Sequence, residues 1–216
     1  FLIFILICFQ GFVGWYMVSS GLIDRIDVSH YRLSLHLIIA FLILSLIFWN
    51  FLIVNNFSTS EIKINIFLPI SFIVLIFLQI TIGAFVSGMD AGKIYNTWPL
   101  MGLSYFPDDN SINNLFKLSV FDDPSLVQFI HRNLAYVIVI FYLLILFISY
   151  VKQINFLKKP LIILGLLLFF QIFLGIVTLI FGAQIILASM HQISSIFLVS
   201  SSVYFLYINT NANQQP

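Results

Sequence analysis

The sequence predicts an all-α fold, a polytopic bundle of transmembrane helices, and two observations support this prediction. Of its 216 residues, 61% are hydrophobic and only 8% are charged, with a mean hydropathy of +1.10. A soluble domain of this length carries far more charge on its surface. Apolar runs long enough to cross a bilayer also recur along the whole chain. Six spans are predicted, at residues 1–18, 30–54, 66–87, 125–149, 161–182 and 185–208.

The connections between these spans predict the orientation of the chain. They are polar segments at 19–29 and 55–65, a long segment at 88–124, a connection at 150–160 and a tight turn at 182–184, with a polar tail at 209–216. Two of them hold four lysines against one acid: Lys63, Lys152, Lys158, Lys159 and Glu61. By the positive-inside rule, 55–65 and 150–160 should face the cytoplasm or matrix. The other side is acidic, with Asp24, Asp27, Asp90, Asp108, Asp109, Asp122 and Asp123.

Composition argues against two classes of site. The net charge is +1 and the nine basic residues are scattered, so no nucleic-acid partner is expected. Cys8 is the only cysteine, which excludes an intrachain disulfide or a cysteine metal cluster. We expect Cys8 to be a small core residue.

A histidine enters the apolar span that begins near residue 124. Asp122, Asp123 and Pro124 form a good helix start, with carboxylates at the positive end of the helix dipole. His131 lies seven residues beyond Pro124, which places it about 10 Å along the helix. An ionisable side chain at that depth in a bilayer is costly, so we expect it to have a function.

A repeated unit contains this histidine. The pattern Gln-x-x-x-Gly begins at Gln10, Gln79 and Gln171, in the first, third and fifth spans. The span that follows each copy holds a histidine, namely His36, His131 and His191. These histidines lie seven residues after Ser29, Pro124 and Gln184, and Ser29 is the expected N-cap of its helix. The three imidazoles should therefore share one level in the outer half of the membrane.

Two interpretations of His131 and His191 remain open. Each could be a buried histidine bonded to a neighbouring carbonyl, or the two could face each other and bind a metal centre. Zinc or copper would need further ligands that these spans lack, whereas an iron porphyrin needs only two axial imidazoles. Arg32 and Arg132 could then bind the propionates of a haem. Small residues that could admit the ring, or simply pack helices, are Gly165, Gly175, Ala188, Ser189, Ser194 and Ser195.

Other polar residues are weaker candidates. The three glutamines could orient the histidines or form hydrogen bonds between helices, and the second role is favoured. His30 lies at a helix mouth and is expected to have no site role. The 88–124 segment is long enough to cover the site, with a short interfacial helix expected at 111–120. Within it, Asp90 could bind a substrate, cap a turn or sit in water.

The sequence resembles the haem A synthase family, of the proteobacterial and mitochondrial type. The matching residues include Gln10-Gly11, Gly14-Trp15, Tyr31-Arg32-Leu33, His36-Leu37, Gly83-Ala84, Asp90-Ala91-Gly92, Tyr95-Asn96-Thr97, Val127-Gln128-Phe129-Ile130-His131-Arg132, Ala188-Ser189 and His191-Gln192. They run in order through nearly the whole chain, so the resemblance is specific.

The family implies eight helices in two pseudo-symmetric halves. By this likeness, 1–54 would be the third and fourth helices of the N-terminal, substrate half, and 55–65 an inner connection. Residues 66–208 would be the C-terminal half, with 88–124 as its outer loop. The chain starts at Phe1 within an apolar run, so we expect the first two helices of the family to be missing here and this segment alone to be inactive.

The resemblance also implies an activity. Haem A synthases oxidise a methyl group of haem O to a formyl group, and a haem b would be held by His131 and His191. His36 would lie at the haem O site as a catalytic residue, with Arg32 and Arg132 near the porphyrins. Haem O synthase is a candidate partner beside an unidentified electron donor and the lipid of a bacterial cell membrane or mitochondrial inner membrane. The alternatives are a cytochrome b that only carries electrons and a non-catalytic haem-handling assembly protein.

Overall fold

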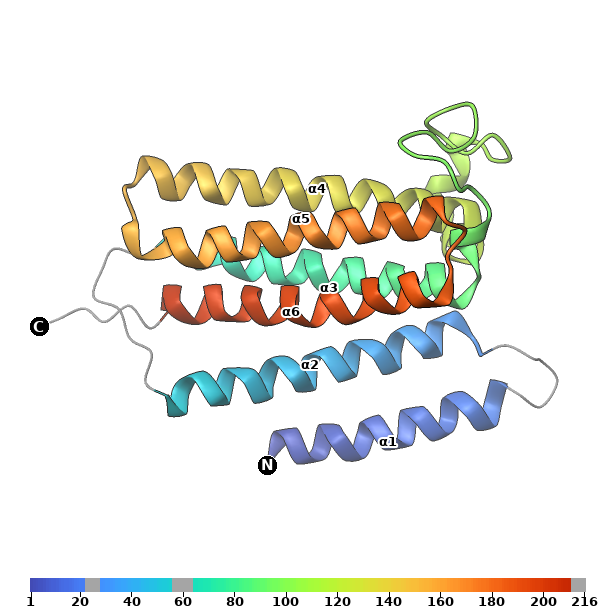
Figure 1. Ribbon diagram of the computed structural model, residues 1–216. Coiled ribbons are helices and arrows are strands. Elements are labelled where there is room, and N and C mark those ends of the chain that lie inside the picture. The colour runs from blue at the N-terminus through green and yellow to red at the C-terminus, as the bar shows by residue number, and fades with distance from the viewer. Residues whose placement is uncertain (22–27, 56–63, 211–216) are drawn as a thin grey trace, which may run out of the picture.

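The structure is a computed structural model that describes residues 1–21, 28–55 and 64–210. Within these ranges it consists of six long helices (Figure 1): α1 (Leu2–Gly21), α2 (His30–Val54), α3 (Phe67–Gly88), α4 (Pro124–Val151), α5 (Lys158–Ile180) and α6 (Ile185–Thr210). Short 3₁₀ helices span Ala91–Lys93, Ile112–Phe116, Leu118–Asp122 and Asn155–Leu157. All six long helices are long and apolar enough to cross a membrane. The prediction of an all-α bundle with six spans is therefore confirmed.

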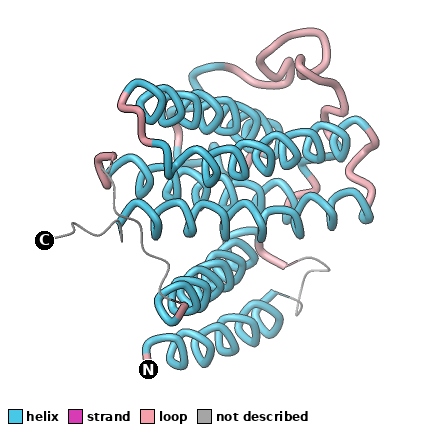
Figure 2. The backbone as a smooth tube through the Cα atoms, turned by 60° about the vertical axis from the view of Figure 1, so that its left-hand side comes forward, coloured by secondary structure: helices cyan, strands magenta, loops and turns pink. Residues whose placement is uncertain are grey.

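Helices α3 to α6 form a four-helix bundle. Successive helices run in opposite directions, so α2, α4 and α6 are parallel to one another (Figure 1). Helix α3 packs against α4 and α6, and α5 packs against the same two helices. Because the contacts follow this ring, α4 and α6 lie on a diagonal of the bundle. Helix α2 packs on α3 and α6, and α1 packs on α2 at the edge of the molecule (Figure 2).

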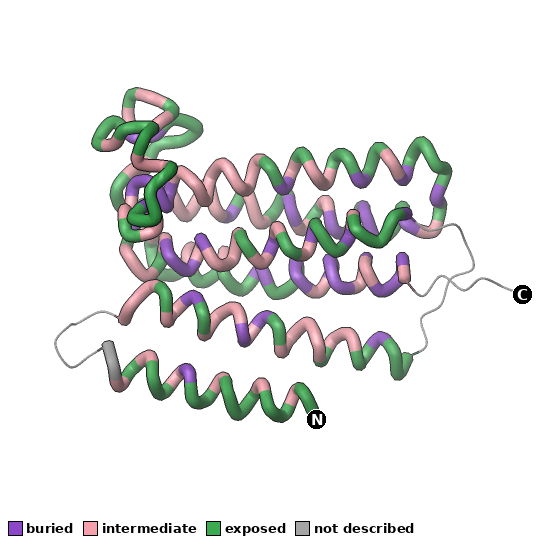
Figure 3. Tube along the Cα trace, turned by 180° about the vertical axis from the view of Figure 1, so that it is seen from behind, coloured by how far each residue is buried: buried purple, intermediate pink, exposed green. Residues whose placement is uncertain are grey.

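The buried apolar core lies mainly in the half of the bundle that carries Lys158. Its most buried members include Phe72, Ile145, Leu161 and Phe205, each 0% exposed. The other half contains a smaller buried cluster of Ile82, Phe85 and Val127. Most side chains of α1 are exposed (Figure 3). The larger apolar core therefore lies toward one end of the bundle, and the smaller one lies near His131.

Helix α4 begins as its sequence predicts. Asp123 is the N-cap residue, and its Oδ1 accepts a hydrogen bond of 3.1 Å from the backbone N of Leu126. Pro124 occupies the first turn, where no backbone donor is needed. The expected N-cap at Ser29 is only partly right. Its carbonyl accepts from Leu33 N at 3.0 Å, but its hydroxyl makes no capping bond.

Three expectations need correction. Asn209 and Thr210 were predicted in the tail but belong to α6. The reason is that the Asn209 side chain is buried: its Oδ1 accepts from Ile64 N at 3.0 Å, and its Nδ2 donates to Ile64 O at 3.1 Å. The helix expected at 111–120 consists of two 3₁₀ helices. Cys8 is exposed, because α1 packs chiefly on α2.

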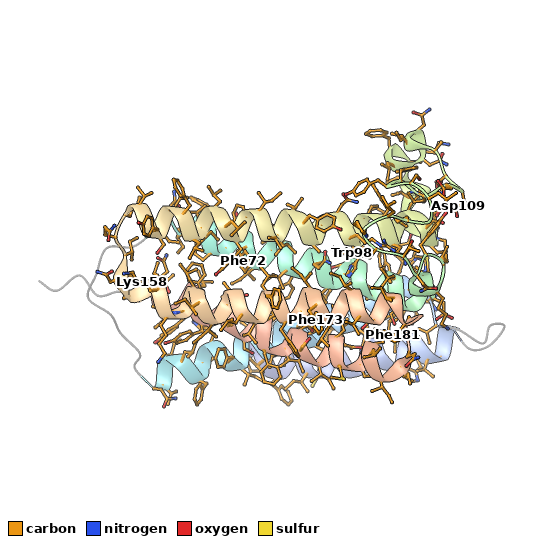
Figure 4. All side chains as sticks on the ribbon, turned by 45° about the horizontal axis from the view of Figure 1, so that its top comes forward. Phe72, Trp98, Asp109, Lys158, Phe173 and Phe181 are labelled. Atoms are coloured by element: carbon orange, nitrogen blue, oxygen red, sulfur yellow. The ribbon has the colours of Figure 1, made fainter. Side chains whose placement is uncertain are left out.

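Part of the predicted orientation concerns residues that the structure does not describe. Asp24, Asp27, Glu61, Lys63 and the tail at 211–216 lie outside the described residues. Among the described residues, Lys158 lies at the end of the bundle opposite Asp109, as expected for the two faces (Figure 4).

Candidate functional site

Each copy of the Gln-x-x-x-Gly pattern binds the histidine of the next helix through the glutamine side chain. Gln10, Gln79 and Gln171 donate from Nε2 to the backbone carbonyls of His36, His131 and His191, at 3.0, 3.0 and 2.9 Å. The same Nε2 lies 3.2, 3.3 and 3.3 Å from one ring nitrogen of that histidine. The glutamines thus bond between helices, as favoured, and also contact the imidazoles.

The glycine of each copy makes room for the imidazole. A methyl group added to Gly14, Gly83 or Gly175 would lie 3.0, 3.1 or 3.0 Å from Cε1 of the facing histidine. In contrast, a methyl group on Gly11 would meet nothing within 4 Å. Glutamine and glycine lie about one helical turn apart on one helix face, so together they fix the position of the ring.

The structure separates the three histidines into two groups. His131 on α4 and His191 on α6 belong to diagonal helices of the bundle. His36 lies on α2, in the hairpin formed with α1. The expected pairing of His131 with His191, with His36 apart, is compatible with this arrangement.

The ring nitrogens allow a test of whether a haem iron fits here. Nδ1 of His131 and Nδ1 of His36 are buried and have no hydrogen-bond partner among the described residues. A buried polar atom without a partner is costly, and a metal ion would satisfy it. No group of three or more His, Cys, Asp and Glu side chains that could hold a metal ion occurs in the described part of the chain. Two imidazoles on facing helices are the donor set that a haem iron uses.

Arg132 has a structural role that sequence reasoning missed. Its Nη1 donates to the carbonyls of Thr97 (2.8 Å) and Leu100 (3.2 Å), and its Nη2 donates to that of Tyr95 (2.9 Å). Only its Nε is buried without a partner among the described residues. The guanidinium therefore fastens residues 88–124, the outer segment, to α4, the helix that carries His131. Nothing in the sequence spacing indicated this contact.

The other arginine candidate stabilises the α1–α2 hairpin. The Arg32 guanidinium lies 4.9 Å from the centre of the Tyr16 ring. This is a cation–π contact between the two helices. It places a cation on the helix of His36, one turn before that residue.

Further bonds hold the 88–124 segment over the outer end of the bundle (Figure 4). Asn96 Nδ2 donates to the carbonyl of Leu179 at 2.9 Å, and Trp98 Nε1 donates to Tyr136 Oη at 3.2 Å. Tyr95 donates its hydroxyl to Asp109 at 2.9 Å. Partial burial, and then this hydrogen bond, raise the pKa of Tyr95 above its usual value. The segment thus covers the end of the bundle nearest the histidines.

Two further polar residues, Asp90 and His30, lie at this end of the bundle. Asp90 is exposed and pairs with Lys93 at 2.8 Å. His30 Nε2 lies 3.4 Å from Oδ1 of Asp122, which also accepts a hydrogen bond from Tyr31 Oη at 2.9 Å. These contacts connect the start of α2 to the outer segment.

The small residues proposed to admit a macrocycle have several roles. Gly175 accommodates the His191 ring, and Gly165 faces the hydroxyl of Tyr142. Ser194 and Ser195 are buried, whereas Ser189 is exposed. Close packing between helices therefore explains at least one of these positions, Gly165.

Comparisons with known proteins show which family the chain belongs to. Residues 1–203 match the model of a family described as cytochrome oxidase assembly protein. A heme A synthase of Pelagibacter ubique (strain HTCC1062) is 50% identical over 210 residues, which cover 97% of this chain and 62% of that protein. The heme A synthases of Rickettsia felis (strain ATCC VR-1525 / URRWXCal2) and Rickettsia bellii (strain RML369-C) are 40% and 42% identical over 214 and 210 residues. Each alignment covers 94% of this chain and 62% of the relative, so the chain spans about 62% of the length of these relatives.

Proposed function

The chain belongs to the cytochrome oxidase assembly protein family, and from this premise we propose that it serves in haem A synthesis. In this proposal a methyl group of haem O is oxidised to a formyl group within the membrane, and a bis-histidine haem b transfers electrons. The membrane is a bacterial cell membrane or the mitochondrial inner membrane. The proposal is supported by the 50% identity to a heme A synthase over 97% of the chain.

His131 and His191 are the residues proposed to hold the haem b. The observation that carries this assignment is their position on the diagonal helices α4 and α6, with a buried and unpartnered ring nitrogen on His131. Held by these two histidines, the haem would supply electron transfer rather than oxygen activation. The oxidation of haem O would therefore take place elsewhere.

His36 is the residue proposed for the substrate side. It is held by Gln10 and Gly14 in the same way as the other two histidines, but on the α1–α2 hairpin. Arg32 lies one turn before it and is a candidate partner for a propionate of haem O. The apolar side chains exposed on α1 and α2 suit the isoprenoid tail of that substrate.

The outer segment is proposed to keep water from the porphyrins. Arg132 binds three of its carbonyls, so the segment is fixed to α4 next to His131. Haem O synthase, as the source of the substrate, and an electron donor are the proposed protein partners.

Because this segment alone is expected to be inactive, the test is co-expression of the full-length protein with a source of haem O, followed by extraction of the haems and mass analysis. Hydroxylated or formylated products that depend on His36 support the synthase. Accumulation of protohaem alone would contradict it and favour a cytochrome b that only carries electrons. A haem that is lost during purification would instead favour a haem-handling assembly protein.

Single histidine variants test the assignment of the ligands. His131→Ala and His191→Ala should each abolish the low-spin haem b spectrum, because either change removes an axial ligand. His36→Ala should keep that spectrum and lose conversion. His30→Ala is the matched control, because His30 lies at the mouth of α2 and contacts Asp122. A haem b spectrum that survives either ligand change would refute the pairing.

A further inference from the structure

The 103–118 stretch of the outer segment turns large apolar side chains outward. Leu103, Phe116 and Leu118 are 94%, 86% and 91% exposed, and Ile112 is 62% exposed. Contact between such side chains and water is unfavourable in proportion to the exposed apolar area. A single exposed leucine needs no explanation, but a group of four in one short stretch marks an interaction surface.

Polar side chains of the same stretch bond to the protein instead of facing outward. Asn114 Nδ2 donates to Asn110 Oδ1 at 3.0 Å, and Lys117 Nζ donates to Asn114 Oδ1 at 2.8 Å. Asn110 Nδ2 in turn donates to Asp123 Oδ2 at 2.9 Å. The stretch therefore satisfies its amides internally and leaves its apolar side chains outside, which is the reverse of a loop that faces water.

Two bonds hold the stretch at the level where α4 enters the membrane. Asn110 bonds to Asp123, the N-cap residue of α4, and Ser125 Oγ donates to Asp109 Oδ2 at 2.5 Å. The apolar run of α4 begins directly afterwards, at Leu126. Because α4 is long and apolar enough to cross a membrane, the stretch lies near the boundary between lipid headgroups and hydrocarbon.

The stretch also projects sideways from the bundle. Figures 1 and 3 view the molecule from opposite sides, and both show it beyond α4, on the side away from α1 and α2. Ile140 and Phe147, two turns apart on one face of α4, are 67% and 63% exposed, as expected of a face that lipid covers. The apolar surface of the stretch therefore continues the lipid-facing surface of the spans.

We propose that the 103–118 stretch is a lipid anchor, whose side chains of Leu103, Ile112, Phe116 and Leu118 insert between the headgroups of the bilayer leaflet at this end. Lys117 lies between two of these residues and is exposed, so its ammonium group remains among the headgroups. The anchor holds one side of the outer segment, and Arg132 holds the other side to α4. This inference does not depend on haem.

The first test is spin-label EPR of this chain in phospholipid nanodiscs. Cys8→Ser gives a cysteine-free background, because Cys8 is the only cysteine. Phe116→Cys and Leu118→Cys then place a nitroxide at exposed positions, where the label displaces no packed side chain. The matched control is Asn113→Cys, at an exposed polar residue of the same 3₁₀ helix as Phe116.

Labels at 116 and 118 should collide with oxygen, which concentrates in lipid, more than with a water-soluble nickel complex. The ratio of the two collision rates should be several-fold higher than for the label at 113. Equal ratios at all three positions would show that the stretch stands in water and would overturn the inference. Labels at 116 and 118 that neither reagent reaches would show that protein, such as a second copy of the chain, covers them, and would also overturn it.

Limited proteolysis in the same nanodiscs gives a second measurement. Phe116→Asn should speed cleavage within residues 111–118 roughly tenfold, because removing a phenylalanine side chain from water is worth at least that factor in an equilibrium constant. Ser111→Asn, which changes an exposed polar residue, is the control and should leave the rate unchanged. Equal cleavage rates in the two variants would contradict the anchor.

Discussion

Replacing Gly83 by alanine should destabilise the protein and disturb the site of His131. The added methyl group would lie 3.1 Å from Cε1 of that ring, which is closer than ordinary van der Waals contact. Gln79, one turn earlier on the same face of α3, lies with Nε2 3.3 Å from ring Nε2 and donates to the His131 carbonyl at 3.0 Å, so moving the ring away from Gly83 strains these contacts. The ring or the helix must therefore move.

Two opposing effects decide the magnitude. Alanine stabilises a helix relative to glycine by about 0.5–1 kcal/mol. Adding a methyl group to a well-packed interior costs about 1–3 kcal/mol. We expect overpacking to win, with a net loss of up to about 2 kcal/mol in the free energy of unfolding. Gly11→Ala is the control, because its methyl group would have no neighbour within 4 Å. This variant should show only the stabilisation that alanine gives a helix.

The assay is unfolding of both variants in detergent micelles, followed by tryptophan fluorescence, with the haem spectrum recorded in parallel. The difference between Gly83→Ala and Gly11→Ala should be about 1–3 kcal/mol. The spectrum of the proposed haem b should change only in Gly83→Ala. Equal stability of the two variants, together with an unchanged spectrum, would show that the glycine is not there to accommodate the imidazole.

Three further predictions follow from contacts outside the repeated pattern. Arg132→Gln removes the charged donor from three carbonyl groups, and each of these hydrogen bonds is worth about 1.5–3 kcal/mol. Limited proteolysis within residues 95–100 should therefore become faster, and an unchanged cleavage rate would contradict the anchoring role. Asn209→Leu leaves the buried backbone N–H and C=O of Ile64 without partners, and unfolding should show a loss of about 1–3 kcal/mol for each group; wild-type stability would mean that water replaces the amide. Tyr142→Phe should cost about 1 kcal/mol through its lost bond to Leu161 but should lessen the cost of Gly165→Ala, whose methyl group would collide with the tyrosine hydroxyl. A double-mutant cycle measures this coupling, and strict additivity would refute it.

Much of the fold followed from the sequence because it depends on local rules. Apolar length alone predicted the six spans, and Asp123 with Pro124 predicted the start of α4. The repeat also predicted that three histidines lie at a similar depth, because a helix rises by a fixed amount per residue. The resemblance to haem A synthases, drawn from motifs in order along the chain, is confirmed by the comparisons.

The tertiary structure decided which of these side chains meet. Spacing gives the depth of a residue but not the rotation of its helix, so it could not show that Gly83 and Gly175 face the imidazoles. Nor could spacing show that the Arg132 guanidinium binds backbone carbonyls of the outer segment. Asn209 was misplaced for the same reason, since a polar residue near a chain end looks like tail until its buried partner, Ile64, is known. Sequence thus determined the helices, because apolar length and capping are local properties, whereas packing of helix against helix determined what each imidazole touches.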